Sequence, residues 1–89
     1  MTVRRRVIVH GLVQGVFFRE TTRRRAEAAG VAGWVANRPD GTVEAVLEGE
    51  PEAVERLARF CEQGPRGAIV EHVEVADDEP EGIVGFSVR

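Results

Sequence analysis

Apolar side chains recur along this chain with two different spacings. In one pattern every second residue is apolar, as at Val43, Ala45 and Leu47, and this alternation is typical of strands. Shorter runs rich in valine and isoleucine have the same character. The pattern predicts strands at 7–10, 31–37, 42–49, 68–75 and 83–89.

The second spacing is helical. Within 51–64, Val54, Leu57 and Cys61 recur every three or four residues and so share one face of a helix. The stretch 19–29 holds mostly helix formers and small apolar residues, and the glycine that follows it is a typical C-terminal stop. We therefore expect two helices, each followed by a strand.

The order of these elements is β-α-β-β-α-β plus one short strand. It fits the ferredoxin-like split βαβ arrangement of the α+β class, in which two helices cover one face of a mostly antiparallel sheet. Each β-α-β crossover is expected to be right-handed. With 89 residues, the chain is expected to form a single domain, 1–89.

A few side chains are expected to be structural. Trp34 and Phe86 are assigned to the core, where Phe86 would alternate with Val84 and Val88 along the last strand. Cys61 lies on the apolar face of its helix, which favours a small buried hydrophobe over a reactive thiol.

The stretch between the first strand and the first helix differs from its surroundings. Gly11 and Gly15 would weaken a strand or a helix, so the residues between them and Arg19 are expected to form a tightly bent loop. Backbone N–H groups that lead into a helix N-terminus can bind an anion, and an arginine adds a planar set of donors for phosphoryl oxygens. The candidate phosphate-binding residues are Gln14, Gly15, Val16, Phe17, Phe18 and Arg19. No Gly-Lys-Ser/Thr follows, so this is not a Walker A loop.

Asn37 closes the second predicted strand. In the split arrangement the first two strands run parallel with one strand between them, so their carboxyl ends lie on the same edge of the sheet, about 10 Å apart. Arg19 and Asn37 could therefore contact the same small ligand.

The distribution of charge favours an anionic ligand. Residues 1–38 carry eight Arg and two Glu, a net +6, whereas 39–89 carry a net −9, and the whole chain −3. Such a field attracts anions without selecting among them.

No apolar run approaches the ~18 residues of a membrane span, and no leader pattern precedes the first strand. Together with a single cysteine, Cys61, this predicts a cytoplasmic protein with no membrane partner.

Several familiar kinds of catalytic centre are missing. His10 and His72 have no cysteine or carboxylate at metal-ligand spacing, so no metal site is expected and both are assigned structural roles. Cys61 and Arg66 are one residue too close for the Cys-x5-Arg loop of cysteine phosphatases, and the single serine, Ser87, offers no Ser-His-Asp triad. An anion site without nucleophile, metal or general acid suits a leaving group that needs no protonation. The carboxylate of an acyl phosphate is such a group.

Two segments match a known family. G-L-V-Q-G-V-F-F-R (11–19) and G-W-V-A-N-R-P-D-G-T-V-E (33–44) resemble the two signature segments of acylphosphatases, and the similarity continues to the terminal F-S-V-R. The resemblance implies hydrolysis of an acyl phosphate to a carboxylate and inorganic phosphate, without a cofactor. It also implies that Arg19 binds the phosphoryl group together with the loop amides of Gln14–Phe18, and that Asn37 orients the attacking water.

The chain departs from the family pattern beside the asparagine. Ala36 stands where many members have a longer residue, and Arg38 where a small hydroxyl residue is frequent. Whether Arg38 competes for phosphate or alters substrate preference is left open.

Two other functions compete with hydrolysis. Arg4–Arg6 and Arg23–Arg25 could bind nucleic acid, but no aromatic platform accompanies them, and solvated surface arginines are the preferred interpretation. A domain that binds an anion without turnover is the other alternative. We expect a monomer whose partners are the small-molecule substrate and its phosphate product.

Overall fold

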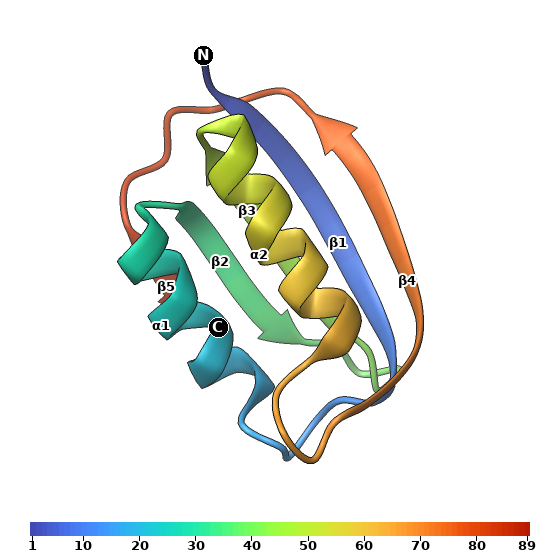
Figure 1. The fold of residues 1–89 in the computed structure, drawn as a ribbon. Coiled ribbons are helices and arrows are strands. Elements are labelled where there is room, and N and C mark those ends of the chain that lie inside the picture. Colours follow the sequence, from blue (N-terminus) through green and yellow to red (C-terminus); the bar gives the residue numbers. More distant parts are fainter.

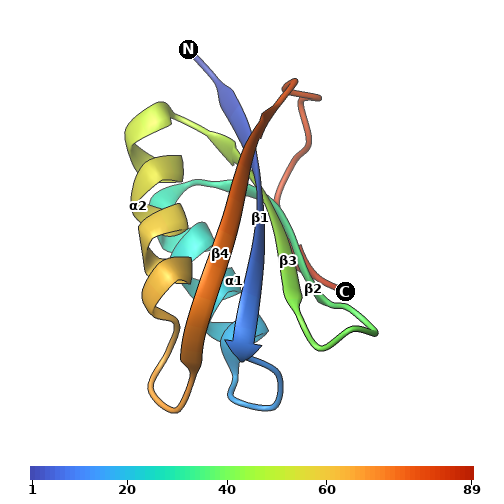
Figure 2. The ribbon, with the colours of Figure 1, turned by 90° about the vertical axis from the view of Figure 1, so that its right-hand side faces the viewer.

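A computed structural model describes residues 1–89 and has the predicted α+β ferredoxin-like fold. Two helices lie on one side of a five-stranded sheet, and the other side of the sheet carries no helix (Figures 1 and 2). The elements in chain order are β1 (Val3–Leu12), α1 (Phe18–Ala29), β2 (Ala32–Asn37), β3 (Val43–Gly49), α2 (Pro51–Gln63), β4 (Ile69–Asp78) and β5 (Phe86–Val88). None of the helices is long and apolar enough to cross a bilayer.

The strand order in the sheet is β4-β1-β3-β2-β5. β3 is antiparallel to both β1 and β2, so β1 and β2 run parallel with one strand between them, as the sequence predicts. β5 pairs in parallel with β2 at the far edge. Because β1 and β2 run in the same direction, their carboxyl ends lie at the same end of the sheet.

The core fills the space between the sheet and the two helices. Alternate strand residues such as Val7, Val9 and Leu47 are fully buried there, and Phe86 and Cys61 join the same cluster, in agreement with the prediction. Trp34, in contrast, lies outside this cluster and is half-buried, with the guanidinium of Arg89 over its ring at 4.5 Å. The expected core position of Trp34 is therefore wrong.

One glycine in β2 permits close contact between strands. Gly33 has φ +140°, and a Cβ built on it would lie 1.8 Å from the carbonyl oxygen of Val46. Its N–H donates to the carbonyl of Gly85 at 2.9 Å, which fixes the start of β5. A glycine is required here by space as well as by conformation.

β1 begins four residues earlier than predicted, because its arginines are paired rather than free. Arg4 is only 6% exposed and contacts the carboxylates of Glu48 at 3.3 Å and Asp78 at 3.4 Å. Arg6 pairs with Glu44 at 2.8 Å. The interpretation of 4–6 as solvated surface is therefore wrong for Arg4, and these pairs join the start of β1 to β3 and to the end of β4.

The end of the chain also differs from the prediction. After β4 the chain crosses one end of the sheet to reach the opposite edge (Figure 1). Backbone N–H groups of Glu81, Gly82 and Ile83 donate to the carboxylate of Glu48 at 2.9, 2.7 and 3.2 Å. Val84 is 97% exposed and Val88 40%, so the predicted alternation of buried residues along 83–89 fails and only Phe86 joins the core.

Candidate active site

The loop between β1 and α1 is anchored at both ends by buried side chains. Val13 is 1% exposed and Phe18 2%, and the ring of Phe18 packs against Phe60. Between these anchors the backbone curls: Gly15 has φ 75° and Phe17 has φ 61°. Left-handed backbone is common for glycine and strained for phenylalanine, and the Phe17 side chain is 82% exposed. This strain marks the loop as a site held in a special shape.

The loop leaves several backbone donors available. None of the N–H groups of 14–17 donates to a backbone carbonyl. α1 begins at Phe18, and the first N–H groups of a helix have no partner within the helix. Unpaired N–H groups in a curled loop before a helix N-terminus form a suitable environment for an anion.

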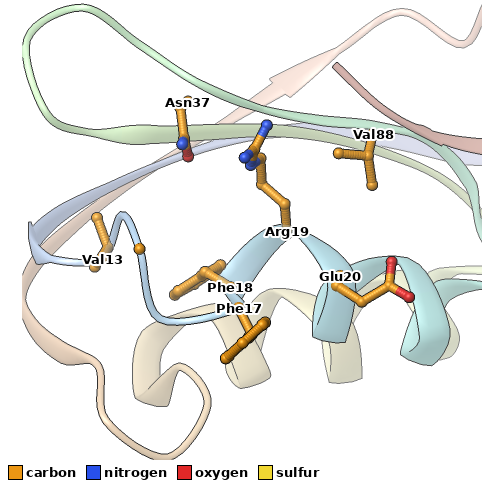
Figure 3. A pocket seen from close by; sticks show the side chains of 8 residues that line it. Val13, Phe17, Phe18, Arg19, Glu20, Asn37 and Val88 are labelled. Carbon is orange, nitrogen blue, oxygen red and sulfur yellow. The ribbon is translucent and has the colours of Figure 1, made fainter.

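Arg19 lies in the first turn of α1. Figure 3 shows its guanidinium directed across the pocket to the side where Asn37 and Val88 lie. Its Nη1 donates to the backbone carbonyl of Arg89 at 3.0 Å. Arg89 directly follows β5, so this edge strand of the sheet helps to orient the Arg19 side chain.

Asn37 is the last residue of β2, and the turn after it is connected to the loop. The side-chain Nε2 of Gln14 donates to the carbonyls of Arg38 at 2.8 Å and Thr42 at 3.0 Å. In the same turn, Asp40 Oδ1 accepts hydrogen bonds from the Thr42 hydroxyl at 2.6 Å and the Thr42 N–H at 3.0 Å. These bonds hold the pKa of Asp40 below its usual value. The loop and the turn therefore form one hydrogen-bonded unit.

A pocket of about 290 Å³ lies between these elements (Figure 3). It is lined by Val13, Gly15, Phe17, Phe18, Arg19, Glu20, Asn37 and Val88. The structure thus brings Arg19 and Asn37 to one pocket, together with three other predicted phosphate-binding residues. Gln14 and Val16 are not among the lining residues, because Gln14 reaches the turn and Val16 packs against the core. Sequence reasoning missed Glu20 and Val88, which no motif singles out.

The carboxylate in the pocket wall is already engaged. Hydrogen bonds from Arg23, at 2.7 and 2.8 Å, lower the pKa of Glu20 to about 2, and Arg24 contributes further. Glu20 is therefore ionised at neutral pH and has no proton to donate. It is suited to hold α1 together rather than to act as a general acid.

Arg38 lies outside the pocket wall. Its Nη2 is 3.8 Å from a carboxylate oxygen of Asp40, within the same turn. In this arrangement its charge is balanced locally.

The remaining reactive side chains lie elsewhere. Cys61 is fully buried, and burial raises the pKa of its thiol to about 12, so it is a poor nucleophile. The two histidines, expected to be structural residues, lie side by side. Strand pairing sets His10 opposite His72, and Glu74 lies beside them. Sequence spacing does not reveal this group, because the register of β1 with β4 brings its members together. The expectation that no metal binds stays a prediction.

The fold and the pocket define a ferredoxin-like domain in which Arg19 and Asn37 line a pocket at the carboxyl ends of β1 and β2. The family model "Acylphosphatase" matches residues 5–88. The chain is 57% identical over 86 residues to an acylphosphatase of Gloeobacter violaceus, covering 97% of this chain and 92% of that one. It is 60% identical over 90 residues to an acylphosphatase of Rubrobacter xylanophilus, covering 99% and 81%.

A solved structure gives the same result. An acylphosphatase from Coxiella burnetii superposes with a TM-score of 0.94 at 39% identity, over 99% of this chain and 93% of that one. The chain belongs to the acylphosphatase family.

Proposed function

We propose that this acylphosphatase uses Arg19 and the loop amides of 14–18 to bind the phosphoryl group, and Asn37 to orient the attacking water. The activity is hydrolysis of the carboxyl-phosphate bond of an acyl phosphate. The observation that supports these roles is that Arg19 and Asn37 line one pocket beside a loop with unpaired N–H groups. Three equatorial phosphoryl oxygens would then meet donors on several sides.

The chemical step follows from this arrangement. The water oxygen bonds to phosphorus while the bond from phosphorus to the acyl oxygen breaks, and the carboxylate leaves with the electron pair. The proton of the water passes to an oxygen of the phosphate itself. Glu20 is the carboxylate in the pocket wall, and its pairing with Arg23 keeps it from acting as the base. Catalysis is therefore electrostatic and positional.

We also propose that no metal takes part in this step. Divalent cations that bind phosphates need carboxylates, and the one in the pocket wall is held by Arg23 and Arg24. Hydrolysis of benzoyl phosphate should therefore proceed unchanged in EDTA.

The decisive experiment compares variants in that assay. Arg19→Ala should lower kcat/KM by at least about 10²-fold, the cost of one lost transition-state donor, and Arg19→Lys should recover little of it because an ammonium lacks the planar fork. Asn37→Ala should lower kcat more than it raises KM. Arg59→Ala is the matched control, since Arg59 is an exposed arginine of α2. Equal turnover by Arg19→Ala and the control would refute the assignment.

The same assay distinguishes hydrolysis from the alternative, a domain that binds an anion without turnover. A domain without turnover would be protected by phosphate against heat while benzoyl phosphate stayed intact. The monomeric state and the cytoplasmic location stay predictions, and sedimentation of the purified protein tests the first.

A further inference from the structure

Three ligand-bearing side chains meet on the face of the sheet that carries no helix. His10 of β1 pairs directly with His72 of β4 across the antiparallel strands, and Glu74 lies two residues further along β4 on the same face. The histidine ring centroids are 5.2 Å apart. His10 Nε2 donates to Glu74 Oε2 at 2.6 Å, and one ligand atom of each residue lies within 4.8 Å of the other two.

The spacing of these atoms is close to that of a zinc centre. A tetrahedral Zn²⁺ with ligand distances of about 2.0–2.2 Å keeps its ligand atoms roughly 3.4 Å apart. The strand pairing already brings the three side chains together, so the movement that zinc binding requires is a change of side-chain rotamers. The proton of the His10–Glu74 hydrogen bond would leave as the ion takes its place.

The donor types narrow the choice of ion. Two imidazoles and one carboxylate suit Zn²⁺ and related borderline transition-metal ions, whereas Mg²⁺ and Ca²⁺ prefer oxygen ligands throughout.

We propose that His10, His72 and Glu74 form a binding site for Zn²⁺ or a similar divalent transition-metal ion, with water completing the coordination. None of the three lines the candidate active site, so this site is separate from the pocket. The ion would join β1 to β4, an edge strand of the sheet, and His10 lies three residues before Val13 and the loop. Its expected effect is on stability, because the ion binds only when the two strands are paired.

The chain offers a clean test, because these are its only two histidines and its one cysteine is buried. Zn²⁺ is titrated into tag-free protein by calorimetry, and Co²⁺ is used as a visible-absorption probe of coordination. His10→Gln, His72→Gln and Glu74→Gln remove one ligand each. Glu71→Gln is the control, since it removes the same charge from an exposed residue of β4 that does not belong to the cluster.

The expected result is one Zn²⁺ per chain, with at least about tenfold weaker binding in each ligand variant and an unchanged affinity in the control. Zn²⁺ should raise the thermal unfolding midpoint of the parent protein and not that of His72→Gln. Circular dichroism confirms that each variant is folded, as expected for exposed or half-buried side chains. The absence of saturable binding at about millimolar Zn²⁺, or equal binding by parent and His72→Gln, would overturn the proposal.

Discussion

Replacing Glu48 with alanine tests how the chain's last segment is attached to the sheet. The Glu48 side chain is buried, at 3% exposure, and accepts hydrogen bonds from three consecutive backbone N–H groups after β4. It also contacts Arg4, which is 6% exposed. Glu48→Ala therefore removes the partner of a buried cation and of three backbone donors at once.

The expected loss of stability is large. Removing one member of a buried ion pair costs about 3–5 kcal/mol, because the other charge is left without compensation. Asp78 and Glu81 approach Arg4 at 3.4 and 3.7 Å, and these more exposed carboxylates favour the lower end of the range. At about 4–8 °C per kcal/mol for a domain of this size, the unfolding midpoint should fall by more than about 12 °C.

The pH dependence gives an independent check. The backbone hydrogen bonds from 81–83, with that of Glu81 first, lower the pKa of Glu48 below its usual value. A carboxyl with a lowered pKa in the folded state stabilises the fold above its unfolded pKa of about 4.3, and this contribution is lost as the pH falls through the folded pKa. The difference in stability between the parent protein and Glu48→Ala should therefore shrink below about pH 4.

The assay is urea unfolding followed by circular dichroism at pH 7 and at lower pH. Glu79→Ala is the matched control, because Glu79 is an exposed glutamate in the same segment. Arg4→Leu combined with Glu48→Leu should lose less than Glu48→Ala, since no buried charge is left unpaired. A free energy of unfolding for Glu48→Ala within about 1 kcal/mol of the control would refute the reasoning.

Three further outcomes are expected. Gln14→Ala removes both hydrogen bonds between the loop and the turn, so benzoyl phosphate hydrolysis should fall about tenfold while urea unfolding shows a loss of only about 1–2 kcal/mol. Gly33→Ala places a methyl group against the Val46 carbonyl and should lower the unfolding midpoint by more than about 10 °C in a thermal melt. The Cys61 thiol, with its pKa raised to about 12, should react with a disulfide reagent in urea but not in the native protein at pH 8; rapid reaction of the native protein would contradict its burial.

The sequence predicts the regular elements well because their patterns are local. Alternation at Val43, Ala45 and Leu47 and the helical spacing of Val54 and Leu57 each identify an element without knowledge of its neighbours. Once the order of elements is known, connectivity alone places the carboxyl ends of β1 and β2 at the same end of the sheet. This predicts that Arg19 and Asn37 lie close together, and the structure has both of them in the wall of one pocket.

Several features that the sequence did not predict depend on pairing between distant segments. Arg4 looks like a surface arginine until Glu48, which lies 44 residues away, is placed beside it. The group formed by His10, His72 and Glu74 exists only in the register of β1 with β4. The orientation of Arg19 by the Arg89 carbonyl requires β5 to lie at the edge next to β2.

The position of β4 at one edge of the sheet has a consequence for how two molecules meet. One side of β4 carries backbone groups that no strand in the chain covers, and Ile69 and Val75 are about half exposed along it. Such an edge can recruit an identical strand from another molecule and begin aggregation. Carboxylates interrupt this strand along its length, at Glu71, Glu74, Asp77 and Asp78. At neutral pH their mutual repulsion opposes edge-to-edge association, and acidification weakens that protection.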